Sequence, residues 1–260
     1  MIFTDTHTHL YLDAFNDDRD QVISRAIETG ITYFFLPNID AESIDSLHQL
    51  ADAYPGNCFA MMGLHPTSVK ENYQTELRKI EDAIDKRDYC AIGEIGIDLY
   101  WDKSFFKEQK AAFTHQLDIA MDLNLPISIH TRDSMEETLD ILSDPAFKDV
   151  RGVIHCFSGN AAQATKAVEL GFYLGIGGVI TFKNSGLKQA IKHIKPESLL
   201  LETDAPFLAP VPYRGQRNES SYIKIIANHL ADLYGMQTEE IAKITTESAL
   251  TLFNITDPII

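Results

Sequence analysis

The sequence predicts an α/β fold, a single (β/α)8 barrel that spans residues 1–260. Short β-rich runs alternate with helical patterns from one end of the chain to the other, which indicates parallel strands joined by crossover helices. The length of 260 residues suits eight strand–helix units. A doubly wound open sheet is the structural alternative, but its Gly-rich phosphate fingerprint does not follow the first run.

The expected strands are short runs rich in β-branched, aromatic and other apolar residues. Each run is followed by a polar segment, as expected when a buried strand ends in a loop. Eight such runs occur, at residues 2–6, 31–36, 58–64, 90–95, 126–130, 152–155, 172–176 and 198–203.

The expected helices show apolar residues at helical spacing between these runs. Gly30 and Gly171 follow two of them as C-terminal caps, and Ser134 with Glu137 predicts a capping box at the start of another. The clearest helical segments are residues 17–29, 41–53, 75–86, 105–123, 161–170, 187–193, 220–234 and 238–253.

Composition predicts an ordinary globular protein, with 45% hydrophobic and 23% charged residues. Cys58, Cys90 and Cys156 form no C-x-x-C pair, so neither a disulfide framework nor a thiolate zinc site is expected. A cytoplasmic location follows, because the N-terminus lacks the basic segment of a secretory signal. No apolar run approaches the roughly 20 residues of a membrane span, so no membrane partner is expected.

The net charge is strongly acidic, with 22 Lys and Arg against 38 Asp and Glu, or −16. A protein with this charge should repel nucleic acid over most of its surface. Residues 181–224 are an exception, with seven basic and four acidic residues. A local phosphate-binding surface is therefore possible there.

A pair of histidines ends the first expected strand, in the sequence Asp5-Thr6-His7-Thr8-His9. Because side chains alternate along a strand, His7 and His9 share one face and can reach one metal ion. Alone, H-x-H is weak evidence, since such histidines are also common as hydrogen-bonded surface or core residues.

Other expected strands also end in side chains that bind metals. Since the carboxyl ends of barrel strands meet at one mouth, these side chains should converge there. Imidazoles and carboxylates together suit zinc, manganese, nickel or iron, and magnesium less well. Six candidates exceed the ligands of one catalytic zinc, so two divalent ions sharing a carboxylate are expected. The candidates are His7, His9, Glu94, His130, His155 and Asp204.

Seven ordered motifs resemble those of the TatD family of metal-dependent deoxyribonucleases, which is similar in fold to the wider amidohydrolase group. They run from Asp5 to Gly215, most of the chain. The motifs are Asp-Thr-His-Thr-His-Leu (5–10), Gly-Leu-His-Pro (63–66), Ala-Ile-Gly-Glu-Ile-Gly-Ile-Asp (91–98), Pro-Ile-Ser-Ile-His-Thr-Arg-Asp (126–133), His-Cys-Phe-Ser-Gly (155–159), Leu-Glu-Thr-Asp-Ala-Pro-Phe-Leu (201–208) and Pro-Tyr-Arg-Gly (212–215).

The resemblance implies a ligand set for each ion. One ion would be held by His7, His9, Glu94 and Asp204, and the other by Glu94, His130 and His155, with Glu94 as the bridge. Asp204 would also accept a proton from the attacking water, so the catalytic residues would be Asp204 and Glu94.

The resemblance also suggests residues on the substrate side. His65, Arg132 and Arg214 are candidates for phosphate contacts, although His65 before Pro66 could simply cap a loop and Arg132 could instead pair with a neighbouring carboxylate. Glu202 lies on the same strand face as Asp204 and would support the ligands or bind an additional metal.

The expected activity is hydrolysis of DNA phosphodiesters, trimming single-stranded DNA ends in the 3′ to 5′ direction, with no obligate protein partner. An amidohydrolase-type enzyme acting on a small phosphoester, lactone or cyclic amide is the alternative, and the charge of −16 favours it. A non-catalytic metal-binding scaffold is a third possibility. Tyr100 and Trp101 could stack on an unpaired base or simply pack in their loop.

Overall fold

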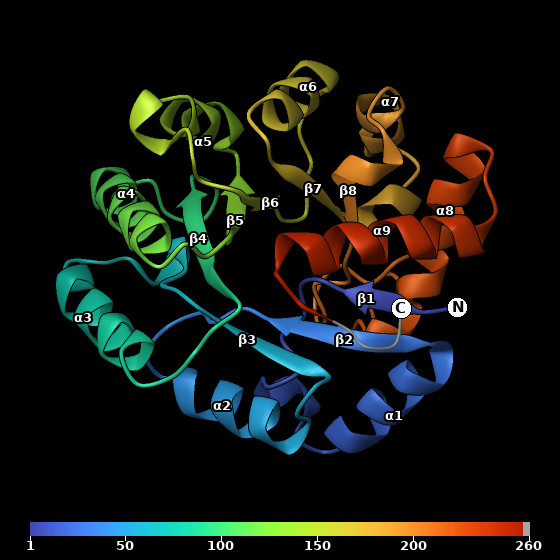
Figure 1. The fold of residues 1–260 in the computed structure, drawn as a ribbon, viewed down its shortest axis with the longest axis horizontal. Helices are drawn as coiled ribbons and strands as arrows, with labels where there is room; N and C mark the ends of the chain where they lie inside the picture. The colour runs from blue at the N-terminus through green and yellow to red at the C-terminus, as the bar shows by residue number, and fades with distance from the viewer. Residues whose placement is uncertain (257–260) are drawn as a thin grey trace.

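The computed structural model describes residues 1–256 and shows eight parallel strands arranged as a barrel, with helices around the outside (Figure 1). The strands pair in chain order, each with the next, so the predicted barrel is confirmed. They are β1 (Phe3–Asp5), β2 (Ile31–Leu36), β3 (Cys58–Met62), β4 (Ala91–Asp98), β5 (Ile127–Arg132), β6 (Gly152–Ile154), β7 (Tyr173–Ile176) and β8 (Leu199–Leu201).

The α-helices alternate with the strands and bury one face each, as amphipathic helices do. In α3, for example, Leu77, Ile80 and Ala83 are buried against the barrel. The helices are α1 (Arg19–Thr29), α2 (Ile44–Ala53), α3 (Tyr73–Ile84), α4 (Phe106–Asp122), α5 (Met135–Leu142), α6 (Ala161–Glu169), α7 (Leu187–Ile191), α8 (Ile223–Tyr234) and α9 (Thr238–Leu252). None of the described helices is long and apolar enough to cross a membrane.

Six short 3-10 helices lie in the connections of the described residues, 1–256. One of them, η2, follows β3 and contributes Thr67 to the cavity at the mouth of the barrel. Their bounds are η1 (Asp13–Phe15), η2 (Pro66–Ser68), η3 (Pro145–Phe147), η4 (Gly178–Thr181), η5 (Pro196–Ser198) and η6 (Ser220–Tyr222).

The first and last strands meet through backbone hydrogen bonds. The Thr6 amide donates to the Leu201 carbonyl at 3.0 Å, and the His9 amide donates to the Ala205 carbonyl at 2.7 Å. These bonds join segments about 200 positions apart and close the seam of the barrel next to His7 and His9.

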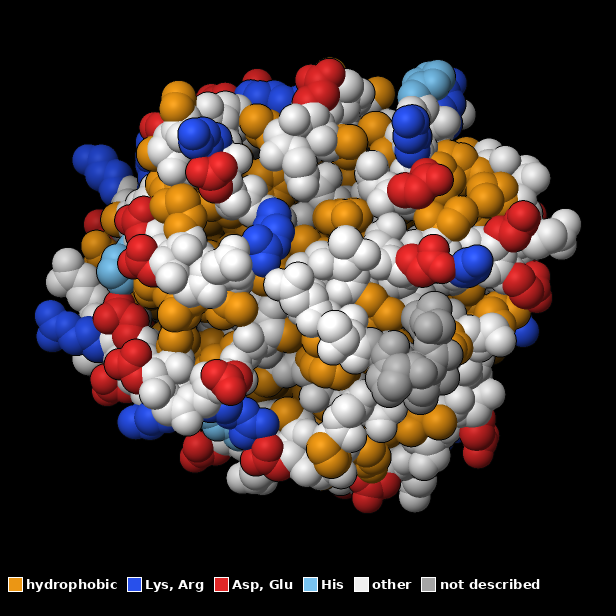
Figure 2. Space-filling model, viewed as in Figure 1, with side chains coloured by type: hydrophobic (Ala, Val, Ile, Leu, Met, Phe, Trp, Pro, Cys, Tyr) orange, Lys and Arg blue, Asp and Glu red, His pale blue; other side chains and the backbone are white. Residues whose placement is uncertain are grey.

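The amino-terminal end of the barrel is covered by α9, which crosses the foreground of Figure 1. Phe253, which follows α9, stacks on Phe35 of β2 with ring centroids 4.2 Å apart. Figure 2 shows the molecule from this side, where acidic and basic side chains are interspersed and form no single basic patch. The opposite, carboxyl-terminal end is the one left open.

Two local predictions differ from the structure. The strand expected at residues 90–95 continues to Asp98, where it pairs with Arg132 of β5. Gly96 makes this close pairing possible, because a Cβ there would lie 2.1 Å from the His130 carbonyl oxygen.

The prediction of a capping box at Ser134 is wrong, since the Ser134 hydroxyl instead donates to the Ile97 carbonyl and accepts from the Arg132 amide. The caps at Gly30 and Gly171 have the expected left-handed φ, at 105° and 90°.

Candidate metal centre

The six predicted metal ligands come together at the carboxyl-terminal mouth. They come from five strand ends: His7 and His9 follow β1, Glu94 lies in β4, His130 in β5, His155 follows β6 and Asp204 follows β8. All of them except His7 line a cavity of about 460 Å³. His7 is buried beside them, with its ring stacked on that of His155 at 3.4 Å between centroids.

Glu94 lies at the centre of the cluster and is 2% exposed. Its Oε2 lies 3.1 Å from His7 Nε2 and 3.6 Å from His9 Nε2. Its other oxygen, Oε1, lies 2.9 Å from His130 Nδ1 and 3.7 Å from His155 Nε2. The two oxygens of one carboxylate therefore face two different pairs of histidines.

The charge state of Glu94 follows from these neighbours. Burial alone raises the pKa of Glu94, but His65, His7 and His155 outweigh burial and hold that pKa well below its ordinary value. Glu94 is therefore an anion in the centre of the site.

His9 is oriented by hydrogen bonds that fix its proton. The Tyr11 hydroxyl donates to the Pro37 carbonyl at 2.6 Å, so the 3.0 Å contact between Tyr11 and His9 requires His9 Nδ1 to be the donor. Burial, helped by neighbouring His155 and His65, lowers the pKa of His9 to about 4. The imidazole is thus neutral, and its Nε2 lone pair faces Glu94 and Asp204.

His7 is held in a similar way, with Nδ1 3.2 Å from the Ser128 hydroxyl. Burial, together with the nearby His155, lowers the pKa of His7 well below its ordinary value. His7 and His9 are therefore both neutral imidazoles, which is the form that binds a metal ion.

Asp204 lies across the cavity from Glu94. Its Oδ1 is 3.6 Å from His9 Nε2 and 4.0 Å from His155 Nε2. Its φ of 58° is uncommon for a non-glycine residue and is held by the Asp204 amide, which donates to the His7 carbonyl at 2.9 Å. Burial raises the pKa of Asp204 to about 7, and the carboxylates of Glu94 and Glu202 contribute to this rise. A carboxyl group with this pKa can take up or release a proton near neutral pH.

Glu202 lies behind His155 and is fully buried. Its Oε1 accepts a hydrogen bond from the Cys156 amide at 2.7 Å and lies 3.0 Å from His155 Nδ1, an ion-pair distance without hydrogen-bond geometry. Although burial lowers the pKa of His155, Glu202 and Glu94 raise it to about 10. Gly175 makes room for this carboxylate, because a Cβ there would lie 2.2 Å from Glu202 Oε2.

His130 and His65 occupy the other side of the cavity. Asp98 Oδ2 lies 2.9 Å from His130 Nε2, and with Glu94 it raises the pKa of His130 although burial opposes the rise. The Thr67 amide donates to His65 Nδ1 at 3.1 Å, so the proton of a neutral His65 sits on Nε2. That N–H faces Glu94 and His130. His65 Nε2 therefore acts as a hydrogen-bond donor in the cavity and does not present a lone pair to a metal ion.

The two predicted arginines have different positions. Arg132 lines the cavity, and its guanidinium lies 4.1 Å from the Tyr100 ring centroid and 5.4 Å from that of Trp101. Within residues 1–256 its guanidinium forms no ion pair, so the alternative pairing with a neighbouring carboxylate is not seen. Arg214 does not line the cavity and instead lies over the Phe182 ring at 4.4 Å.

These residues fit divalent metal ions. Glu94 and Asp204 are buried carboxylates, and no Lys or Arg pairs with either of them in the described part of the chain. Their partners are imidazoles, and the Nε2 lone pair of His9 faces both carboxylates. Glu202 Oε2 is buried and has no partner among the described residues. Two buried carboxylates and the lone pair of neutral His9 that converge on one cavity repel one another unless a cation lies between them, and nitrogen and oxygen donors of this type suit a divalent ion.

Sequence reasoning missed several supporting residues. Tyr11, Ser128 and Thr67 orient His9, His7 and His65, and none of the three was predicted as a site residue, although Ser128 lies within the motif at 126–133. Asp5 was recognised only as the first residue of a motif and not as a site residue. It is buried and accepts hydrogen bonds from the amide and hydroxyl of Thr203, which ties β1 to the segment carrying Asp204. Period-two spacing from His7 was the available signal, since Asp5 shares its strand face.

Comparison with known proteins identifies the family of the chain over nearly its whole length. Residues 4–254 match the family described as TatD related DNase. A metal-dependent hydrolase of Bacillus subtilis, YabD, is 40% identical over 98% of this chain and 100% of its own length. A Pantoea ananatis protein named 3'-5' ssDNA/RNA exonuclease TatD is 32% identical over 96% of this chain and 99% of its own. The crystal structure of YjjV, a TatD homologue from Escherichia coli, superposes with a TM-score of 0.91 at 31% identity, covering 98% of both chains. The chain belongs to the TatD family of metal-dependent hydrolases.

Proposed function

We propose that this protein is a phosphodiesterase that uses two divalent ions to shorten single-stranded DNA from its 3′ end. The observation that carries the proposal is the position of Glu94, whose two oxygens face two separate groups of histidines. The relative from Pantoea ananatis, named as a 3'-5' ssDNA/RNA exonuclease, supports the choice of substrate and direction.

The ligand sets divide at Glu94. His7, His9 and Asp204 would hold one ion on the Oε2 side, while His130 and His155 would hold the other on the Oε1 side. When bound, such a pair of ions supplies a strongly acidified water and positive charge for the phosphoryl oxygens. His155 would lose its extra proton on binding, because a ligand imidazole must be neutral. Zinc, manganese, nickel and iron suit these donors better than magnesium.

Asp204 is the proposed general base. Its Oδ1 points into the cavity, and burial already raises the pKa of Asp204 to about 7, so it can accept a proton from the attacking water. The Nε2 proton of His65 and the guanidinium of Arg132 line the same cavity and would stabilise negative charge on the phosphoryl group. Arg214 lies outside this cavity, and a contact with more distant phosphates is the role left to it.

The charge of the protein favours DNA ends over duplex DNA. A duplex footprint requires many cationic contacts, and this chain has a net charge of −16. A single strand end bound at the metal centre needs few such contacts.

Glu202 is best supported as the residue that positions His155, since its Oε1 is already engaged with His155 and the Cys156 amide.

Digestion of a 5′-labelled single-stranded oligonucleotide tests the proposal. With added manganese or zinc, wild-type protein should give a ladder that shortens from the 3′ end, and EDTA should stop it. Asp204→Asn should give no ladder and serves as the contamination control. An inert wild type, with hydrolysis of small phosphoesters or lactones instead, would replace the DNA assignment with the amidohydrolase-type alternative. Metal binding without hydrolysis of any of these substrates would support the third possibility, a non-catalytic metal-binding scaffold.

A further inference from the structure

Two large aromatic side chains project into solvent beside the metal centre. Trp101 is 67% exposed and Tyr100 is 53% exposed, and both follow β4. Their backbone is fixed, because Asp98 Oδ1 accepts hydrogen bonds from both of their amides at 2.9 Å. The rings are thus held in place without being buried. Asp98 also contacts His130 at 2.9 Å, so one carboxylate links the aromatic loop to the metal centre.

Arg132 completes this surface. Its guanidinium stacks over the Tyr100 ring and stays within 5.4 Å of the Trp101 centroid, while no acidic side chain of residues 1–256 pairs with it. A cation held by aromatic faces keeps its N–H groups available for an anion. The surface therefore offers an aromatic face and an unpaired cation together, and Trp101 and Arg132 both line the metal-centre cavity.

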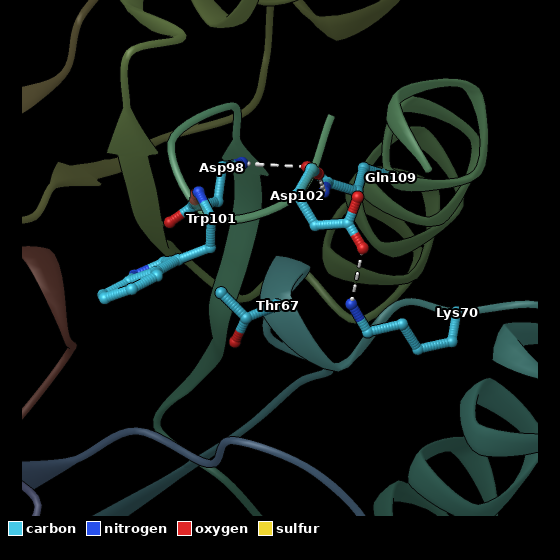
Figure 3. Close-up of a pocket in the computed structure, with 6 residues that line it drawn as sticks. All are labelled: Thr67, Lys70, Asp98, Trp101, Asp102 and Gln109. Carbon is cyan, nitrogen blue, oxygen red and sulfur yellow. Dashed lines mark hydrogen bonds and ion pairs between the residues drawn. The ribbon is translucent and has the colours of Figure 1, made fainter. Parts of the chain in front are cut away.

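Trp101 lies between two cavities. One is the cavity of the metal centre, and the other is a side cavity of about 480 Å³ that contains Lys70, Asp102 and Gln109 (Figure 3). In the side cavity the Lys70 ammonium is paired with Asp102 at 3.3 Å, and Asp98 adds a second carboxylate. This charge balance disfavours a phosphate. Its mixed donors and acceptors suit a neutral, polar group such as the edge of a nucleobase or a sugar.

We propose that Trp101, Tyr100 and Arg132 form a stacking platform that binds one unpaired nucleobase and the phosphate attached to it. The proposal rests on the proposed function. The base would stack on Trp101 with its polar edge toward the side cavity, and Arg132 would contact the phosphate on the metal-centre side. A base in a duplex has both faces covered, so the platform would select single strands with little preference for sequence.

The fluorescence of Trp101 provides a direct test, because it is the one tryptophan in the sequence. Asp204→Asn protein, which should bind without turnover, is titrated with oligothymidylate in manganese buffer. Stacking should quench the fluorescence, whereas an abasic oligonucleotide of equal length should quench it far less. Binding is followed in parallel by the anisotropy of a labelled oligonucleotide. Equal quenching by both oligonucleotides, or binding with no quenching, would overturn the platform, as would the absence of binding.

Kinetics of Trp101 variants give a second test. Stacking energies of roughly 1–3 kcal/mol per base correspond to about a 5- to 150-fold rise in KM for single-stranded DNA in Trp101→Ala. Trp101→Phe keeps an aromatic face and should recover most of the loss. Abasic substitution at the stacked position should slow wild type but add nothing to Trp101→Ala. Leu123→Ala removes another exposed apolar side chain, just past the end of α4, and is the matched control.

The two proposals can fail separately. If wild type digests the oligonucleotide with metal and Trp101→Ala has the same KM, the proposed stacking platform is wrong and the proposed nuclease activity is supported. If wild type does not digest DNA, the proposed function is wrong, whatever Trp101 does.

Discussion

The two sides of the metal centre are built differently. On the side of β1 and β8, His7, His9 and Glu202 are buried, and Tyr11 and Ser128 fix the two imidazoles of His7 and His9. On the side of β4 and β5, the strands lead into exposed groups, Arg132 and the Tyr100–Trp101 pair. The buried side is suited to holding an ion in fixed geometry, and the open side to contacting a substrate. Glu94 is the residue that the two sides share.

Loss of Glu94 should have the largest effect, because it removes the anion common to both sides. In Glu94→Gln we expect activity on single-stranded DNA to fall by on the order of 1000-fold or more, and bound metal per chain to fall with it. Metal content is measured by mass spectrometry after gel filtration. Glu169→Gln, an exposed change in α6, should leave both values unchanged. Full metal content in Glu94→Gln would remove Glu94 from the ligand set.

Asp204→Asn should make the metal-free protein more stable, although it removes the proposed general base. In metal-free wild type the pKa of Asp204 rises from 3.8 to about 7 on folding, so folding takes up a proton between these values. Ionisation of Asp204 therefore lowers the free energy of unfolding of the wild-type protein as the pH rises from 4 to 7. Urea unfolding in EDTA should show Asp204→Asn more stable by about 2–4 kcal/mol at pH 8, with the difference vanishing near pH 4.

The control for this stability difference is Asp122→Asn, an exposed change at the end of α4. It should alter the free energy of unfolding by less than about 0.5 kcal/mol at either pH. Equal stabilities of wild type and Asp204→Asn at pH 8 would show that Asp204 is not destabilised by its surroundings.

Tyr11→Phe should weaken the buried side without removing a ligand. Loss of the hydroxyl frees His9 Nδ1, and the loss of such a supporting contact lowers metal affinity by roughly 10–100-fold. Competition with a chelator measures the affinity, and kcat at saturating metal should change little. Tyr33→Phe is the matched control, because the Tyr33 hydroxyl is buried without a partner in the described chain. Unchanged affinity in Tyr11→Phe would mean that β1 alone positions His9.

Arg132→Lys should have the smallest effect, on the open side only. The substitution keeps the positive charge but loses the planar group that stacks on Tyr100, so KM for single-stranded DNA should rise by about 3–10-fold. Metal affinity should stay at the wild-type value, measured by the same chelator competition. A loss of metal affinity would contradict the division between the two sides.

The sequence predicted most of this fold because each strand carries its own apolar pattern and each helix its own spacing. The ligand-type residues could be found in the same way, since they follow those strands directly. The supporting contacts could not, because they depend on side-chain directions across the barrel, as between Tyr11 and the Pro37 carbonyl. Local rules also failed where tertiary contacts competed, and Ser134 bonds to β4 instead of capping α5.

The seam between β1 and β8 makes the metal centre dependent on the complete barrel. Thr6 and Leu201 are 195 residues apart in the sequence, and the Asp204 amide bonds to the His7 carbonyl within the same seam. Contacts of such long range form late, because the intervening chain must first be ordered. A chain emerging from the ribosome therefore carries His7 and His9 long before it acquires Asp204. Hydrolysis through the proposed base Asp204 would begin only when the barrel has closed, and the growing polypeptide would remain inactive until then.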